Sequence, residues 1–161
     1  MAFGTVEQAI QDIRDGKFVV VADDEDRENE GDLICAAQLV TPAMVNFMLR
    51  AKGMICVALT HERVSQLGLR MQTSENSEAM RTAFTVSIDA SPAYGVTTGI
   101  SASDRAQTIR VAADPSKGPA DIRTPGHVHP LRAEMAACCA SVIPKRRYEP
   151  LPFCRTQSGR E

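Results

Sequence analysis

The chain has 161 residues, a length that suits one folded domain with a single core. Hydrophobic residues make up 43% and charged residues 24%, as in ordinary globular proteins, and a net charge of -2 argues against a nucleic-acid or membrane-surface partner. No apolar run reaches the roughly 18 residues of a membrane span, the N-terminus lacks a signal-peptide core, and the five cysteines show no repeated spacing. These features predict a cytoplasmic protein in a reducing compartment and leave its chemistry open.

The first part of the chain predicts helices alternating with strands. Apolar residues at helical spacing and continuous β-branched runs are the signals used. They predict a helix over residues 6–15, a buried strand over 18–22, a second strand over 33–37, a helix over 41–50 that begins with Thr41 as N-cap and Pro42, and a third strand over 54–59.

The remaining elements are shorter and are separated by turn residues. We expect a short helix over residues 61–67, a loop over 76–81, a half-buried strand over 84–88, a turn over 95–99, a helix from Ser103 to Ala113, and a proline-bounded loop over 123–131. Strands that alternate with helices predict an α/β or α+β domain.

An acidic segment, DDEDRENEGD at residues 23–32, directly follows the first predicted strand. A solvated acidic turn is the simplest interpretation of such a charge run. However, the segment lies between two apolar runs, which hold its backbone near the sheet, and it contains Arg27 and Gly31. Carboxylates at a strand end can bind Mg²⁺, and an arginine can bind phosphate through two parallel hydrogen bonds. The segment therefore favours a site for a phosphorylated, oxygen-rich substrate on Mg²⁺.

Five segments, in the same order, resemble those of the 3,4-dihydroxy-2-butanone 4-phosphate synthases. They are FVVVADDEDRENEGDL at residues 18–33, GMICVAL at 53–59, FTVSIDA at 84–90, GVTTGISASDRAQTI at 95–109 and RTPGHVHPLRA at 123–133. The resemblance covers about residues 5–133 and implies the α+β fold of that family, a mixed sheet surrounded by helices. It also implies a homodimer with active sites near the interface, a family domain over residues 1–133, and a poorly ordered, non-family tail over 134–161.

The activity implied by the resemblance is that of a carbon–carbon lyase of riboflavin biosynthesis. Such an enzyme converts ribulose 5-phosphate to 3,4-dihydroxy-2-butanone 4-phosphate and formate, with Mg²⁺ or Mn²⁺ and without an organic cofactor. The reaction moves protons at carbons next to a carbonyl group, which requires positioned acid and base groups.

Carried over residue by residue, the resemblance assigns His127, Glu28 and Asp32 to catalysis, and Glu28 also to the metal. The residues expected to bind substrate are Arg27, Glu28, Asp32, Thr98, Ser101, Asp104 and Arg105. The alternative for His127 is a structural loop histidine, and for Arg105 it is a surface arginine on a capped helix start.

Other positions carry weaker assignments. Asp26 and Glu30 match motif positions without a firm role, and Cys56 matches a pocket-facing cysteine, although a buried strand cysteine is the simpler interpretation. His129 departs from the apolar residue usual in the family, and His61 lies outside the motifs.

The resemblance ends at Ala133. The family continues with a Gly-Gly-Val-Leu strand and a Gly-His-Thr-Glu-Ala motif, whose histidine is the second metal ligand. This chain reads EMAACCASVIPKRRYEPLPFCRTQSGRE instead and has no histidine after His129. Suitable codons for residues 134–148, read in another frame, encode Asp-Gly-Gly-Val-Leu-Arg-Val-Gly-His-Thr-Glu-Ala-Ala. We infer a frameshift after Ala133, in the gene or its sequencing; an unrelated natural tail is the alternative. A catalytically inactive fragment is the alternative function.

Overall fold

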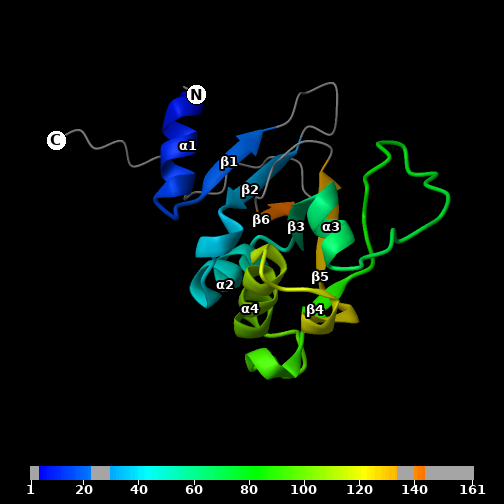
Figure 1. Cartoon of the computed structure of the whole chain (residues 1–161). Coiled ribbons are helices and arrows are strands. Elements are labelled where there is room, and N and C mark those ends of the chain that lie inside the picture. Colours follow the sequence, from blue (N-terminus) through cyan, green and yellow to red (C-terminus); the bar gives the residue numbers. More distant parts are fainter. Residues whose placement is uncertain (1–3, 23–29, 134–139, 144–161) are drawn as a thin grey trace.

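The computed structural model describes residues 4–22 and 30–133, and the backbone of residues 140–143. Its centre is a mixed six-stranded sheet with the strand order β1-β2-β6-β3-β5-β4, in which β3 and β5 are parallel and every other neighbouring pair is antiparallel (Figure 1). The strands are β1 Val19–Ala22, β2 Gly31–Cys35, β3 Met54–Thr60, β4 Ile88–Ala90, β5 Ile122–Ala133 and β6 Ala140–Ile143. The α+β fold with a mixed sheet is therefore confirmed.

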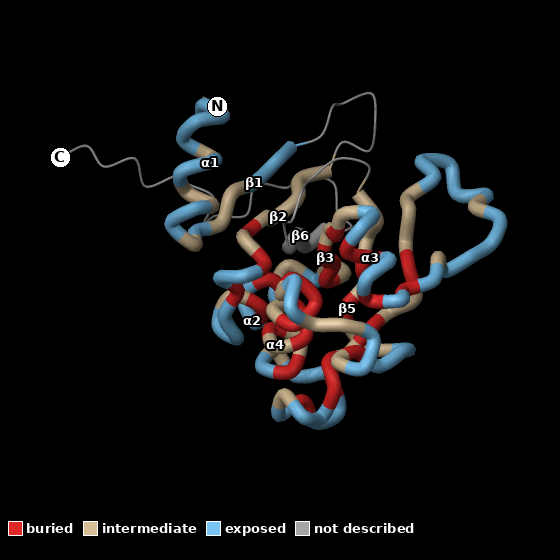
Figure 2. Tube along the Cα trace, viewed as in Figure 1, coloured by how far each residue is buried: buried red, intermediate tan, exposed pale blue. Residues whose placement is uncertain are grey.

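Two of the helices form the cover of the sheet. The helices are α1 Val6–Arg14, α2 Pro42–Arg50, α3 His61–Gln66 and α4 Ala102–Ala113, with short 3-10 turns η1 Ala37–Leu39, η2 Pro92–Tyr94 and η3 Pro119–Asp121. Helices α2 and α4 pack against each other and bury Val45, Met48 and Ile109 in the core (Figure 2). Thr41 and Ser101 cap them by accepting hydrogen bonds from backbone N–H groups of the first turn, at 3.2 Å and 3.0 Å.

Side-chain alternation divides the sheet into two chemically different faces. Val57 and Leu59 of β3, Cys35 of β2 and Val128 of β5 belong to the hydrophobic core under α2 and α4. Because successive side chains of a strand point to opposite faces, their strand neighbours lie on the other face. These neighbours are Asp32, Cys56, His127 and His129. The ionisable side chains thus share the face opposite the core that α2 and α4 cover.

The expectation of a buried first strand was wrong. Val20 and Val21 of β1 are 42% and 48% exposed, because β1 is the edge strand and has β2 as its single neighbour. The apolar run is a strand as expected, but its burial depends on what covers the sheet edge, which local sequence does not encode.

The expectation of a loop over residues 123–131 was also wrong, because this segment belongs to β5. Pro130 still takes part in the pairing, since its carbonyl oxygen accepts a hydrogen bond from the Thr85 N–H at 3.0 Å. Other predicted element boundaries differ less from the observed ones. Strand β2 begins at Gly31, so that Asp32 lies within it, and α4 begins at Ala102 rather than Ser103. The strand expected over residues 84–88 is reduced to β4 and to isolated bridges at Phe84 and Thr85.

The sheet also contains residues 140–143 of the non-family tail, as strand β6. Strand β6 pairs with β2 on one side and with β3 on the other, for example Leu33 with Val142 and Val142 with Ile55. The other residues of that tail lie outside the described part of the chain.

Candidate active site

A carboxylate–imidazole pair joins β4 and β5 near the N-terminal end of α4. Asp89 of β4 accepts a hydrogen bond from the backbone N–H of His127 at 2.9 Å through Oδ1, and its Oδ2 lies 2.8 Å from Nδ1 of the His127 ring. The Asp89 side chain is 14% exposed and that of His127 is 38% exposed. Since a carboxylate accepts the Nδ1 proton, the neutral ring carries its free lone pair on Nε2. The pair therefore presents a partly accessible, oriented proton acceptor.

Glycines at two positions create the space for this pair. A Cβ on Gly126 would overlap the backbone of Ile88 and Asp89, where the pairing of β4 with β5 is irregular. A Cβ on Gly99, whose φ is +85°, would overlap the Asp89 carboxylate. At both positions a side chain would overlap a neighbouring residue, so glycine is required. The positive φ of Gly99 also favours glycine there.

Two basic side chains surround the pair. Arg105 donates from Nε to the carbonyl of Ile100 at 2.9 Å; burial lowers the pKa of its guanidinium, while the charge of Asp89 acts in the opposite direction. Burial also lowers the pKa of His129, and the neighbouring charges of Arg105 and His127 add to this effect. Arg105, His129, His127 and Asp89 therefore form one electrostatically coupled group.

Further along the same face lie Asp32 and Cys56. Burial, reinforced by the negative charge of Asp32, raises the pKa of the Cys56 thiol to about 12. Cys56 therefore stays protonated at neutral pH and is a poor nucleophile. It pairs with His129 across β3 and β5, which links this part of the face to the carboxylate–imidazole pair.

The remaining residues expected at the site lie around the start of α4. Thr98 is exposed in the turn before the helix, and Ser101 is the N-cap. Asp104 is 5% exposed and accepts hydrogen bonds from the N–H groups of Thr97 and Gly99 at 3.3 Å and 3.0 Å, and from the Thr97 hydroxyl at 2.8 Å. In this geometry Ser101 and Asp104 hold the turn that carries Gly99 against Asp89.

We expect Asp104→Ala to lower the free energy of unfolding by about 2–4 kcal/mol, because the buried Gly99 N–H and the part-buried donors of Thr97 lose a charged acceptor. Burial acts to raise the pKa of Asp104, but the hydrogen bonds from Thr97 and Gly99 outweigh it and hold that pKa below its usual value. The stabilisation should therefore be complete above the unfolded pKa of about 3.9 and be lost as the pH falls through the lower folded value. Urea denaturation at several pH values measures this, and Glu75→Ala, at an exposed carboxylate, is the control. A loss no larger than that of the control would contradict the assigned role.

The acidic motif is only partly within the described chain. Asp26, Arg27 and Glu28 lie outside it, whereas Glu30 and Asp32 lie at the start of β2, where Glu30 is half-buried. Within residues 4–22 and 30–133, no group of three or more His, Cys, Asp or Glu side chains could hold a metal ion. The same residues contain no helix with the length and apolar character of a membrane span.

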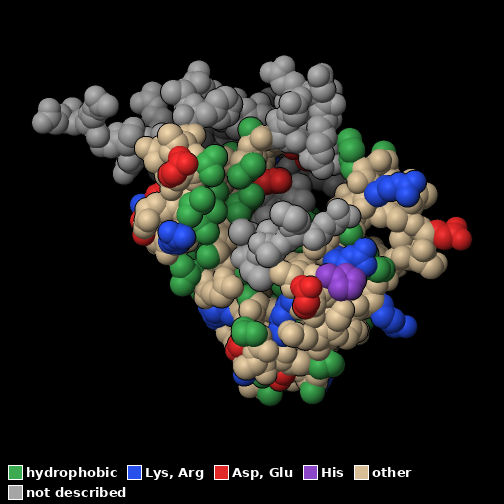
Figure 3. Space-filling model, turned by 45° about the horizontal axis from the view of Figure 1, so that its top comes forward, with side chains coloured by type: hydrophobic (Ala, Val, Ile, Leu, Met, Phe, Trp, Pro, Cys, Tyr) green, Lys and Arg blue, Asp and Glu red, His purple; other side chains and the backbone are tan. Residues whose placement is uncertain are grey.

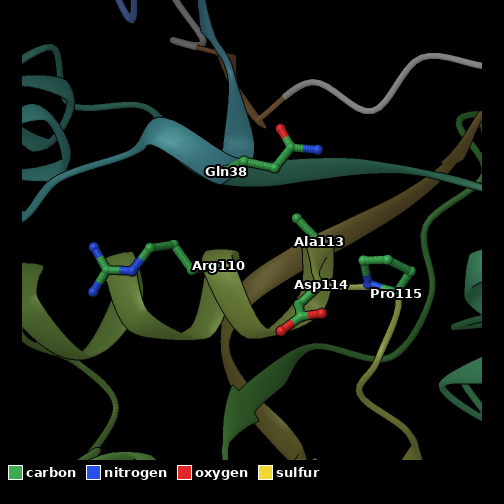
Figure 4. A pocket seen from close by; sticks show the side chains of 5 residues that line it. All are labelled: Gln38, Arg110, Ala113, Asp114 and Pro115. Atoms are coloured by element: carbon green, nitrogen blue, oxygen red, sulfur yellow. The ribbon is translucent and has the colours of Figure 1, made fainter.

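A hollow of about 380 Å³ lies elsewhere, at the C-terminal end of α4 (Figure 4). Gln38, Arg110, Ala113, Asp114 and Pro115 line it. Arg110 donates to the Val40 carbonyl at 2.9 Å and to Gln107 at 2.6 Å, so its guanidinium has structural partners. From Arg105 to Ala113 the helix rises about 12 Å, which separates this hollow from the carboxylate–imidazole pair.

Sequence reasoning missed Asp89, although it stands in the FTVSIDA segment. An acidic residue that directly follows an apolar strand pattern was the available signal. Its partner His127 is 38 positions away, and their pairing depends on the register of β4 and β5.

Comparison with known proteins gives a consistent result. A family model described as 3,4-dihydroxy-2-butanone 4-phosphate synthase matches residues 7–139, beyond the end of the resemblance at residue 133. The chain is 57% identical over 133 residues to the riboflavin biosynthesis protein RibBA of Synechocystis sp., covering 82% of this chain and 24% of the relative. It is 51% identical over 135 residues to the 3,4-dihydroxy-2-butanone 4-phosphate synthase of Pseudomonas aeruginosa, covering 83% and 36%. The chain thus spans about a quarter to a third of the length of these relatives.

The fold comparison agrees. A solved 3,4-dihydroxy-2-butanone 4-phosphate synthase in complex with two magnesium ions superposes with a TM-score of 0.82 and 40% identity, covering 88% of this chain and 75% of that one. Since the family model spans most of the sequence and the fold matches as well, the chain belongs to the 3,4-dihydroxy-2-butanone 4-phosphate synthase family.

Proposed function

We propose that this chain carries the acid–base residues for converting ribulose 5-phosphate to 3,4-dihydroxy-2-butanone 4-phosphate and formate, a carbon–carbon lyase reaction in riboflavin biosynthesis. The observation that carries the proposal is the Asp89–His127 pair, which joins β4 and β5. Family membership supports this choice of reaction, and the pair provides an acid–base group of the kind that the reaction requires.

His127 is the proton carrier in this proposal. Its Nε2 removes a proton from a carbon next to the substrate carbonyl and returns it later in the reaction. Asp89 holds the tautomer in which Nε2 is basic and stabilises the imidazolium that forms. Asp32 lies on the same face, and Cys56 contributes a neutral thiol there.

The metal requirement is also proposed, as Mg²⁺ or Mn²⁺ without an organic cofactor. A magnesium-bound relative supports it, as does the affinity of Mg²⁺ for carboxylate oxygens such as that of Glu28. Among the described residues, no group of three or more His, Cys, Asp or Glu side chains could hold a metal ion. The proton steps above involve only the chain's own groups.

The proposal extends to a homodimer in the cytoplasm with no nucleic-acid or membrane partner. Apolar side chains on the surface support the dimer: they gather on the face shown in Figure 3, and exposed large ones include Val6, Ile10, Val20 and Val21. Such surface is typical of protein–protein interfaces. Sedimentation analysis at micromolar concentration tests it, and a concentration-independent monomer would contradict it.

The catalytically inactive fragment is the second candidate. The chain contains no histidine beyond His129, whereas the resemblance places the second metal ligand in a later Gly-His-Thr-Glu-Ala motif. A chain with the family reading frame restored after Ala133 separates the two candidates.

In that restored chain, we expect Asp89→Asn to lower kcat for formate release by about 10²–10⁴-fold with little change in KM. An asparagine can stabilise the wrong tautomer and cannot stabilise the imidazolium, so the loss falls on the transition state. Formate production from ribulose 5-phosphate with Mg²⁺ measures it, and Asp89→Glu should restore part of kcat. Wild-type kcat in Asp89→Asn, with an intact melting transition, would remove the pair from the mechanism.

A further inference from the structure

Strand β5 presents His127 and His129 on the same face. Val128 between them is fully buried in the core, so both imidazoles are turned to the opposite side of the sheet. Positions i and i+2 of a strand are about 6.6 Å apart, within the span that one bound cation can bridge.

The His127 ring is held in an orientation that suits metal coordination. Asp89 holds Nδ1 of His127 at 2.8 Å, which directs the Nε2 lone pair outward. A carboxylate on the second ring nitrogen is the usual outer partner of a metal-bound histidine, because it fixes the ring and increases the basicity of the ligand atom. His129 is half-buried on the same face of β5.

We propose that His127 and His129 form a two-imidazole site for a borderline transition-metal cation such as Zn²⁺, with Asp89 as its positioning carboxylate. Water completes the coordination, because the described residues contain no third ligand in reach. Arg105 adds a positive charge beside the site and Asp89 offsets it. The site differs from an oxygen-ligand magnesium site, since imidazole nitrogen suits Zn²⁺ and Mg²⁺ prefers oxygen.

One consequence concerns the proposed reaction. A cation bound at Nε2 of His127 occupies the atom that would otherwise accept the proton, so Zn²⁺ should inhibit turnover. Zinc binding itself does not depend on that reaction and is tested separately on the chain as printed.

The test is a Zn²⁺ titration followed through the ring Cε1–H resonances of the three histidines. We expect the resonances of His127 and His129 to move together, that of His61 on α3 to stay unchanged, and millimolar Mg²⁺ to move neither of the β5 pair. His129→Phe should weaken the zinc response of His127 by more than about 10-fold, and His61→Asn, the matched control, should not. Uptake by cysteines alone would leave the β5 resonances unmoved and overturn the proposal.

A second variant tests the positioning role. Asp89→Asn keeps both ligands but loses the carboxylate, and should weaken zinc binding by about 10–100-fold. Thermal melting of each variant shows that the fold is retained, and His129→Gln replaces His129→Phe if the latter does not melt cooperatively. Equal zinc affinity in the wild type and in a folded His129 variant would refute the site.

Discussion

Replacing His127 with asparagine in the restored-frame chain should lower kcat by about 10²–10⁴-fold and change KM by less than about threefold. A general base acts on the transition state, so its loss appears in the rate of the chemical step and not in substrate binding. The ring is also held at Nδ1 by a carboxylate that is itself 14% exposed, an arrangement that asparagine cannot reproduce.

Steady-state formate release from ribulose 5-phosphate provides the measurement. His61→Asn is the matched control, because His61 is an exposed residue at the start of α3, outside the carboxylate–imidazole group. If His127→Asn keeps its kcat and only KM rises, then His127 binds substrate or supports the fold, and the proposed proton transfer belongs to another residue.

The 161-residue chain, with its present tail, should release formate more than about 100-fold more slowly than the restored-frame chain. Loss of a metal ligand should exceed the 10–100-fold effects that are typical of outer-sphere partners. Mg²⁺ dehydrates reluctantly, so a single carboxylate such as that of Glu28 would bind it weakly. Parallel assays with Mg²⁺ and Mn²⁺ on the two purified proteins give the comparison.

Thermal melting of both chains separates a missing ligand from a missing fold. A cooperative melt of the printed chain without formate release supports the inactive alternative. Equal turnover of the two chains would contradict both the functional meaning of the frameshift and the assignment of the second ligand. Sequencing the gene across the codons for residues 133–148 tests the frameshift itself.

Local signals predicted the helices well. Helix α2 was expected over residues 41–50 because Thr41 is a good N-cap and Pro42 suits the first helical position, and the structure has Pro42–Arg50 with the Thr41 cap formed. Such signals act within one or two turns, so they need no knowledge of the rest of the chain.

Elements defined by distant partners were harder to predict. Residues 123–131 contain Pro125, Gly126 and Pro130, which favour a loop locally. The segment is nevertheless a strand, because it pairs in parallel with β3 and antiparallel with β4. The Asp89–His127 pair has the same origin. Sequence motifs identified His127, but only strand register brought its carboxylate to it.

The position of β6 has a consequence for how the chain folds during synthesis. Strands β1 and β2 join the rest of the sheet through β6 alone, since β2 has β1 and β6 as its neighbours. The pairing of Leu33 with Val142 spans 109 positions, from 142 minus 33, so it is among the least local contacts of the fold. Before residues 140–143 leave the ribosome, the β1–β2 hairpin therefore has no partner among the other described strands. Until then its contact with the core comes from residues such as Phe18, which packs against Phe47 of α2. Until then the strand between β2 and β3 is missing, so the part of the polar face that contains Asp32 and Cys56 is incomplete.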